Sequence, residues 1–175
     1  MSIKKIIKNV KKIRATVENA KKIVEIQKQH GSFANYIEKF KDNPIILANN
    51  LVEEFKYLGR ETVWDFLKSI GLDAIKPDIH VRRILFRLGL ISSCKPHPKV
   101  EEEVFEVAKK ISKSTGEKLG VIDAIIWFYG ADMPNLIKKP ICGKKPRCNE
   151  CNLTELCKHY KNKTLLKFLN NKKIH

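Results

Sequence analysis

Apolar residues recur at helical spacing along most of the chain, and this pattern constrains the fold more than any other feature of the sequence. They repeat every three or four positions, which places them on one face of an α-helix. The pattern covers segments at about residues 3–29, 33–40, 44–55, 60–70, 79–88, 99–113 and 117–130, with a short helix expected at 165–169. No run of useful length alternates apolar and polar residues as a half-buried strand does. The sequence therefore predicts an all-α fold.

Several residues mark where these helices begin and end. The first segment reads as one long or two short amphipathic helices that end at Gly31, and Ser32 is suited to cap the next helix. Pro44 is suited to the first turn of a third helix. One stripe of the first segment is apolar and has lysines opposite; its members are Ile3, Ile6, Ile7, Val10, Ile13, Val17, Ala20 and Val24. In the helix at 60–70, we expect one buried face made of Val63, Phe66, Leu67 and Ile70.

The charge of the chain restricts the kinds of partner it can have. The formal net charge is +16, and residues 1–30 and 158–175 are its most basic parts. Such an excess points to phosphate backbones or anionic surfaces. The alternative is that each basic end is only a solvated face.

The sequence shows no export or membrane signal. Its start has charge but no uninterrupted apolar core, and the most apolar run, at 121–128, is too short to span a membrane and contains Asp123. Four of the five cysteines are clustered near the end of the chain, which fits a reducing compartment better than a disulfide framework. We therefore expect a cytoplasmic protein.

The clustered cysteines predict a metal centre. Cys142, Cys148, Cys151 and Cys157 follow the pattern C-x5-C-x2-C-x5-C. Four thiolates in so short a loop could hold a [4Fe-4S] cluster or a tetrahedral zinc ion. Structural zinc sites usually have two closely spaced cysteine pairs, and this loop has one, so the spacing favours iron–sulfur over zinc and both over a disulfide.

Cations lie between these cysteines. Lys144, Lys145 and Arg147 would be held on a loop fixed at four points. Such a loop would make a rigid contact with phosphate, which favours a structural role for the cluster.

A second candidate site is the turn before Arg60. A helix, a short turn containing Gly59 and another helix would direct backbone N–H groups outward, where they and the helix dipole favour a phosphate. Gly59 allows close approach, and Thr62 can donate or cap. The alternative is an ordinary αα-hairpin with a glycine at its corner.

The third candidate is Asp78, directly before a helix that also carries Arg82, Arg83 and Arg87. An aspartate in this position is a natural N-cap. A carboxylate held near a DNA backbone could also stabilise an oxocarbenium-like sugar, or orient a water, while an N-glycosidic bond is cleaved. The two roles are compatible. His80 is interpreted as a structural hydrogen-bonding residue, and the arginines beside the acid suit a polyanion.

The order of these features resembles the helix-hairpin-helix DNA glycosylase superfamily, which includes endonuclease III and the adenine glycosylase acting on mismatches. The matching segments are Leu58-Gly59-Arg60-Glu61-Thr62, Asp78-Ile79-His80-Val81, Trp127-Phe128-Tyr129-Gly130 and Lys145-Pro146-Arg147-Cys148 with Cys151 and Cys157. A second resemblance, to 3-methyladenine DNA glycosylase I, runs from Ile6 to Phe40 and continues through Phe55-Lys56-Tyr57-Leu58-Gly59.

The resemblance implies a helical domain at 1–137, with the hairpin at about 45–70, followed by a four-cysteine iron–sulfur loop and basic tail at 138–175. It implies a monofunctional DNA N-glycosylase of the nucleoid that flips a damaged or mispaired base out of double-stranded DNA. Asp78 would assist cleavage of the N-glycosidic bond. DNA contacts would come from Leu58, Gly59, Arg60, Thr62, Lys144, Lys145 and Arg147, and the four cysteines would hold a [4Fe-4S] cluster.

The chain also departs from these families. Glu61 stands where bifunctional members carry a lysine, and an acid cannot form a Schiff base. Tyr57 replaces the first hairpin glycine, and the first cysteine gap is five residues instead of six. Several early helices of those families have no counterpart, so a second copy or a partner chain would complete the base pocket. Two alternatives stay open: an AP-site lyase that uses another amine, and a non-catalytic iron–sulfur DNA-binding module.

Overall fold

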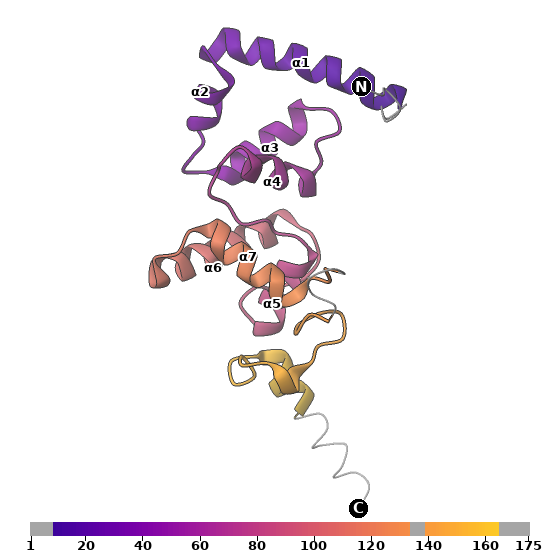
Figure 1. Cartoon of the computed structure of the whole chain (residues 1–175). Coiled ribbons are helices and arrows are strands. Elements are labelled where there is room, and N and C mark those ends of the chain that lie inside the picture. Colours follow the sequence, from indigo (N-terminus) through magenta and orange to yellow (C-terminus); the bar gives the residue numbers. More distant parts are fainter. Residues whose placement is uncertain (1–8, 134–138, 165–175) are drawn as a thin grey trace, which may run out of the picture. The chain divides into compact units, whose positions relative to one another are not determined.

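The computed structural model describes residues 9–133 and 139–164. Seven α-helices and one short 3-10 helix follow one another in this part of the chain, and it contains no β-strand (Figure 1). The all-α fold predicted from the sequence is therefore confirmed. The chain divides into two compact units, residues 1–72 and 73–175. The predicted boundary after residue 137 and the predicted helix at 165–169 lie outside the described residues.

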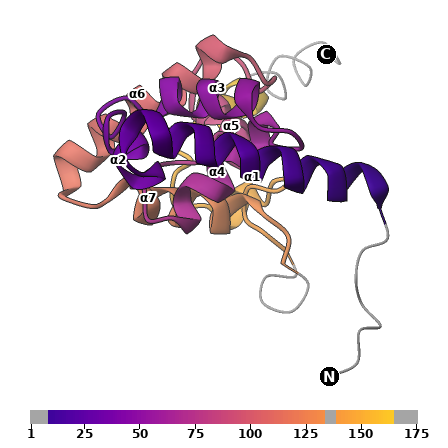
Figure 2. The same ribbon diagram turned by 90° about the horizontal axis from the view of Figure 1, so that it is seen from above.

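Four helices make up the first unit. They are α1 (Val10–His30), α2 (Phe33–Glu38), α3 (Pro44–Glu54) and α4 (Arg60–Ser69). Figure 2 shows α1 as one uninterrupted helix, so of the two interpretations of this segment the single long helix is correct.

The helix ends of this unit follow from local chemistry. The side chain of Ser32 accepts a hydrogen bond from Asn35 N at 3.0 Å and caps α2. Pro44 occupies the first turn of α3, where a missing N–H costs nothing. Gly31 ends α1 with a φ of 80°, which a glycine adopts without steric strain.

The core of the first unit lies between α3 and α4. Its fully buried side chains are Leu47, Ala48, Leu51, Val63, Trp64 and Leu67. The expected buried face of α4 is correct for Val63 and Leu67, while Phe66 is half-buried. Ile70 is 45% exposed, so its predicted burial is wrong. The reason is that α4 already ends at Ser69, and Ile70 lies in the turn that follows.

The apolar stripe of α1 is in contact with solvent. Its described members are all exposed: Val10, Ile13, Val17, Ala20 and Val24. The side of α1 that meets the rest of the unit instead carries Ala15 and Ile26, which are 5% and 3% exposed. Apolar spacing alone would have assigned the opposite orientation to this helix.

The second unit contains α5 (Ile79–Leu88), α6 (Pro98–Thr115), α7 (Leu119–Gly130) and the 3-10 helix η1 (Cys148–Glu150). The three α-helices pack around a core that includes Val81, Leu85, Val104, Phe105, Ala108 and Ile122. Helices α5 and α7 approach closely at Gly130, where an added Cβ would lie 2.7 Å from Ile84 Cδ1. This contact fixes the distance between the end of α7 and the middle of α5.

Candidate functional site

The turn between α3 and α4 is the predicted phosphate contact of the hairpin. Gly59 is the N-cap of α4 and has no side chain with which to cap it. Its own N–H donates to Thr62 Oγ1 at 2.9 Å, and the Thr62 hydroxyl is 3.1 Å from Gly59 O. The first turn of α4 therefore begins at an exposed glycine, so an anion could approach the helix N-terminus.

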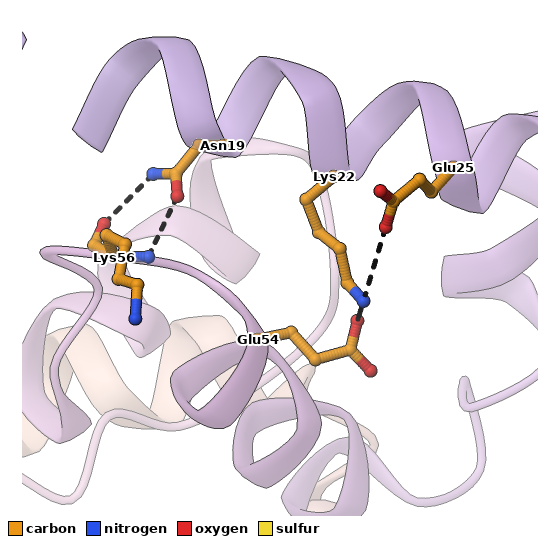
Figure 3. Close-up of polar contacts among 5 residues, drawn as sticks. All are labelled: Asn19, Lys22, Glu25, Glu54 and Lys56. Carbon is orange, nitrogen blue, oxygen red and sulfur yellow. Dashed lines mark hydrogen bonds and ion pairs between the residues drawn. The ribbon is translucent and has the colours of Figure 1, made fainter. Parts of the chain in front are cut away.

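This turn is fixed to α1 by two polar contacts, which Figure 3 shows side by side. The Asn19 amide donates to Lys56 O at 2.9 Å and accepts from Lys56 N at 2.8 Å. Lys22 lies between Glu25 and Glu54, with N–O distances of 3.8 and 3.2 Å. A side-chain amide that bonds both backbone groups of one residue holds that residue as an adjacent strand would. This role was not predicted from the sequence, where Asn19 has no spacing that marks it.

Tyr57 adopts a left-handed backbone conformation in the same turn, with a φ of 60°. This conformation is uncommon for a bulky residue. A glycine would adopt it without steric strain, and the Asn19 contact to the preceding residue, Lys56, helps to hold Tyr57 in it.

The predicted DNA-binding residues of the hairpin differ in accessibility. Gly59 and Thr62 are exposed, while Leu58 and Arg60 are half-buried. The guanidinium of Arg60 donates to Asn49 Oδ1 on α3. Arg60 therefore also links the two helices of the hairpin, and its contact with DNA stays a prediction.

Asp78, in the second unit, is the N-cap of α5. Its Oδ1 accepts from His80 N at 2.8 Å and from Val81 N at 3.0 Å. The residue is 8% exposed. Both cap bonds go to one oxygen, so the carboxylate is oriented by the backbone of the helix that it begins.

Arg82 supports the loop that carries Asp78. This arginine is buried, and its guanidinium donates to Pro77 O and, at 3.2 Å, to Cys94 O. It joins the segment before Asp78 to the loop after α5. Asp78 is thus held by its own bonds to the first turn of α5 and by the contact of Arg82 with Pro77, the residue before it.

His80 is a structural hydrogen-bonding residue in this geometry. Its Nδ1 is 3.1 Å from both Gly130 O and Arg83 Nη2, and its ring meets Trp127 edge to face at a centroid distance of 6.0 Å. The contacts with Gly130 and Trp127 tie the start of α5 to the end of α7, while the contact with Arg83 lies within α5.

Two arginines of α5 hold the cysteine loop. Arg87 donates to Gly143 O at 2.7 Å and to Cys142 O and Lys144 O at 3.2 Å, and Arg83 Nε is 3.4 Å from Cys142 O. The sequence suggested instead that these arginines suit a polyanion. Buried loop carbonyls that have no backbone donor need a side-chain donor. Arg83 and Arg87 are four residues apart, which places them on the same face of α5, and this spacing could have indicated that they share a role.

All four clustered cysteines are half-buried, and the sulfurs of Cys142, Cys151 and Cys157 have polar neighbours. Cys142 Sγ accepts from Arg87 Nη1 at 3.3 Å, and Cys151 Sγ accepts from Leu153 N at 3.4 Å. Cys157 Sγ donates to Arg87 O at 3.4 Å. Donors directed at thiolate sulfur are what metal-bound cysteines receive.

In donor chemistry these residues fit a [4Fe-4S] cluster or zinc. Within residues 9–133 and 139–164, no three His, Cys, Asp or Glu side chains are arranged to hold a metal ion. The ligand set therefore stays a prediction that rests on the residue types and their sulfur contacts.

The ionisable groups near the loop follow its burial and charge. Burial raises the pKa of Tyr129, whose hydroxyl is 3.9 Å from Cys151 Sγ, and the bond to that sulfur acts in the same direction. Burial also lowers the pKa of His159, and the positive charges of Arg87 and Lys163 lower it further. Both shifts identify a partly desolvated region beside the cysteines, and the His159 shift also reflects the positive charges near it.

The cations predicted to contact DNA from this loop fall into two groups. Lys144 and Lys145 are exposed. Arg147 is half-buried and donates to Glu150 Oε2 and to Lys139 O, each at 2.6 Å. The lysines therefore present their charge outward, whereas the guanidinium of Arg147 stabilises the loop itself.

None of the described helices is both long and apolar enough to cross a membrane.

Comparison with known proteins gives one match. Residues 1–54 match the family model described as methyladenine glycosylase. The matched part covers α1 to α3 and ends before the hairpin turn. No curated protein and no solved structure matches the chain. The match supports a DNA glycosylase-like family, a general DNA glycosylase role and DNA as substrate.

Proposed function

We propose that this chain is a monofunctional DNA N-glycosylase that removes a damaged or mispaired base from double-stranded DNA. The observation that carries the proposal is the methyladenine glycosylase match over residues 1–54. The matched segment supplies Asn19, Lys22 and Glu54, the residues that fix the hairpin turn. The match thus coincides with the scaffold of the proposed phosphate contact.

In this proposal the hairpin binds the DNA backbone. Gly59 leaves room for a phosphate at the start of α4, and Thr62 shapes the turn through its bonds to Gly59. Backbone N–H groups and the helix dipole favour a negative charge at this point. Lys144 and Lys145 add a second, salt-sensitive contact.

Asp78 is the proposed catalytic residue. Its carboxylate would stabilise positive charge on the deoxyribose as the N-glycosidic bond breaks. The base leaves with the bonding electrons and takes up a proton, and a water molecule adds its oxygen to C1′. The bonds from His80 N and Val81 N orient the carboxylate before substrate binds.

A lyase step through the hairpin is not part of the proposal. Glu61, an exposed residue in the first turn of α4, has no amine to attack the sugar. The product is therefore an intact strand with an abasic site.

The proposed metal centre is a [4Fe-4S] cluster bound by Cys142, Cys148, Cys151 and Cys157. Its role would be to fix the loop that presents Lys144 and Lys145. Arg87 and Leu153 N support the sulfurs of two of these cysteines. A brown protein with visible iron–sulfur absorption and about four irons per chain supports this proposal. Stoichiometric zinc in a colourless protein contradicts it.

The function is tested with duplexes carrying uracil, mismatched thymine, oxidised bases or alkylated bases. Asp78→Asn is the matched variant, because asparagine caps a helix about as well as aspartate but carries no charge. We expect the wild-type protein to excise at least one of these bases and Asp78→Asn to bind the same duplex without excising it. Borohydride should trap no covalent adduct.

One observation favours a second function, a non-catalytic DNA-binding module. Asp78 is largely buried, and its role as an N-cap accounts for its presence without any chemistry. If cluster-loaded protein binds DNA with a steep salt dependence yet releases no base from the whole panel, this second function stands and the glycosylase proposal falls.

A further inference from the structure

The outer face of α1 carries a continuous apolar row, here called the α1 seam. It consists of Val10, Ile13, Val17, Ala20 and Val24. The four larger side chains are 62%, 52%, 53% and 48% exposed in chain order. Scattered apolar residues are ordinary on a protein surface, but a row along most of one helix is the kind of patch that marks an interaction site.

The spacing of the α1 seam identifies the shape of what it can bind. Its residues follow one another in alternating steps of three and four, which is the heptad pattern of a helix that packs against a second helix. In the sequence, Ile3 and Ile6 continue this spacing, although they lie outside the described residues. The row uses only two positions in every seven residues, so it is narrow, and it contains no aromatic side chain. Helices that lie in a membrane surface have a broader apolar face, commonly with Trp, Phe or Leu.

The seam belongs to a helix that is held in place from its other side. Asn19 and Lys22 point toward Lys56 and Glu54 (Figure 3), and helical spacing places them on the side of α1 away from the seam. Ala15 and Ile26 are buried on the same inner side. The exposed row is therefore presented on a fixed support, and α1 cannot turn to bury it without breaking these contacts.

Charge along the seam identifies the chemistry of the partner. Arg14, Lys21 and Lys28 are exposed and follow three seam residues by four positions each, so they line one edge. The other edge carries the uncharged Thr16 and Ile23. In heptad terms the basic edge is position e and the uncharged edge is position g.

A second copy of α1 is a poor match for these edges. In a parallel pair, each basic residue would face an uncharged one and form no ion pair. In an antiparallel pair, the two basic edges would face each other and repel. A helix with carboxylates beside its apolar residues would instead pair with all three cations.

We propose that the α1 seam is the docking site of a partner protein, which it binds through an amphipathic helix with an apolar heptad row and an acidic edge. This role goes beyond DNA binding or base excision, because neither the hairpin turn nor Asp78 contributes to it.

The test uses the full-length chain and two fluorescent synthetic peptides of about four heptads each, with Ile and Leu at the apolar positions. One peptide has Glu at positions e and g, and the other has Lys. We expect fluorescence anisotropy to show at least about tenfold tighter binding of the Glu peptide. Val17→Asp should weaken that binding by about tenfold or more, since it places a charge in the middle of the seam. Gln29→Asp adds the same charge at an exposed position off the seam and should leave binding unchanged.

A charge reversal separates recognition from misfolding. The double variant Arg14→Glu and Lys21→Glu should prefer the Lys peptide, and a damaged protein could not gain a new preference. Equal binding of the two peptides, or binding of neither, overturns the proposal.

Two other occupants are outcomes of the same set of measurements. A dimer of the unmodified chain in light scattering that Val17→Asp dissociates would show that a second copy covers the seam. Binding to phosphatidylglycerol vesicles that Val17→Asp abolishes, in the absence of peptide binding, would assign the seam to a membrane surface. Either result overturns the proposal in favour of that occupant.

Discussion

The Asp78 carboxylate caps α5 through Oδ1, and the same group is the proposed catalytic carboxylate of the second unit. At the scale of single residues, the stability role and the chemical role can be separated by the choice of substitution. The sequence predicted both roles, because an aspartate before a helical segment is a recognisable cap. It could not predict Arg82, whose partners are two loop carbonyls brought together only by folding.

Asp78→Ala and Asp78→Asn should differ in stability. Alanine cannot accept from His80 N and Val81 N, so we expect a loss of about 1 kcal/mol in the free energy of unfolding. Asparagine keeps the cap and should lose a few tenths of a kcal/mol at most. Urea unfolding followed by circular dichroism measures both. Equal losses for the two variants would show that the cap bonds do not stabilise α5.

Gly130→Ala should be destabilising although alanine is the better helix former. The added Cβ would lie 2.7 Å from Ile84 Cδ1, a buried atom, and we expect a cost of about 1 to 2 kcal/mol from overpacking. Ile84→Val removes that Cδ1 atom, so the double variant should recover much of the loss. Thermal unfolding of the two single variants and the double variant measures the coupling. Strict additivity would contradict the proposed steric cause.

At the scale of helices and loops, α5 connects the proposed acid to the cysteine loop. Its N-terminus is capped by Asp78, and near its C-terminus Arg87 binds the backbone of three loop residues. Helix positions were predictable because caps and breakers such as Ser32, Gly31 and Pro44 act locally. The orientation of α1 was not, since periodicity identifies an apolar face without showing what covers it. The inner side of that helix uses Asn19 and Lys22, which no apolar pattern reveals.

Arg87→Met should loosen the cysteine loop. It removes the donor for three carbonyls and for Cys142 Sγ, and we expect the free energy of unfolding to decrease by about 2 kcal/mol. Limited proteolysis should then cut between residues 142 and 147 faster than in the parent protein. Arg87→Lys keeps the charge but cannot reach all three carbonyls, so its stability and cleavage rate should lie between those of the parent protein and Arg87→Met.

Lys145→Met is the control for the Arg87 prediction. It changes an exposed cation of the same loop and should leave both the unfolding midpoint and the cleavage rate unchanged. If Arg87→Met behaves like this control, the loop does not depend on α5.

At the scale of the whole molecule, the two units carry different parts of the proposed activity. The hairpin turn belongs to residues 1–72, whereas Asp78 and the four cysteines belong to residues 73–175. The family match lies within the first unit, over residues 1–54, and ends before the hairpin turn. The residues of the candidate site were predicted one by one from motifs and stay predictions. The contacts that support them join positions far apart in the sequence, such as Asn19 with Lys56 and Arg87 with Cys142, and no motif indicates these.

The salt dependence of DNA binding should identify which lysines contact phosphate. Replacing Lys144 and Lys145 together by Gln should reduce the slope of log K against log salt by about 1.8, or about 0.9 for each lost contact. Lys109→Gln with Lys110→Gln removes the same charge from exposed positions on α6 and should leave the slope nearly unchanged. Fluorescence anisotropy at several salt concentrations measures both. An equal decrease in the two double variants would show that only net charge matters.

Arg87 also meets the cysteine loop at both of its ends. Its guanidinium bonds the backbone at Cys142 and Gly143, and its carbonyl accepts from Cys157 Sγ at 3.4 Å. One helical residue thus holds the two ends of the loop together without a covalent link, so part of the chain entropy of loop closure is already lost on folding. Removing a bound metal with a chelator should therefore leave the helical circular dichroism signal nearly unchanged, and the emptied loop should be able to reload. A loop whose ends are already held together would leave only the placement of its cysteine side chains to metal binding, so gain or loss of a metal would be an event separate from the folding of the second unit.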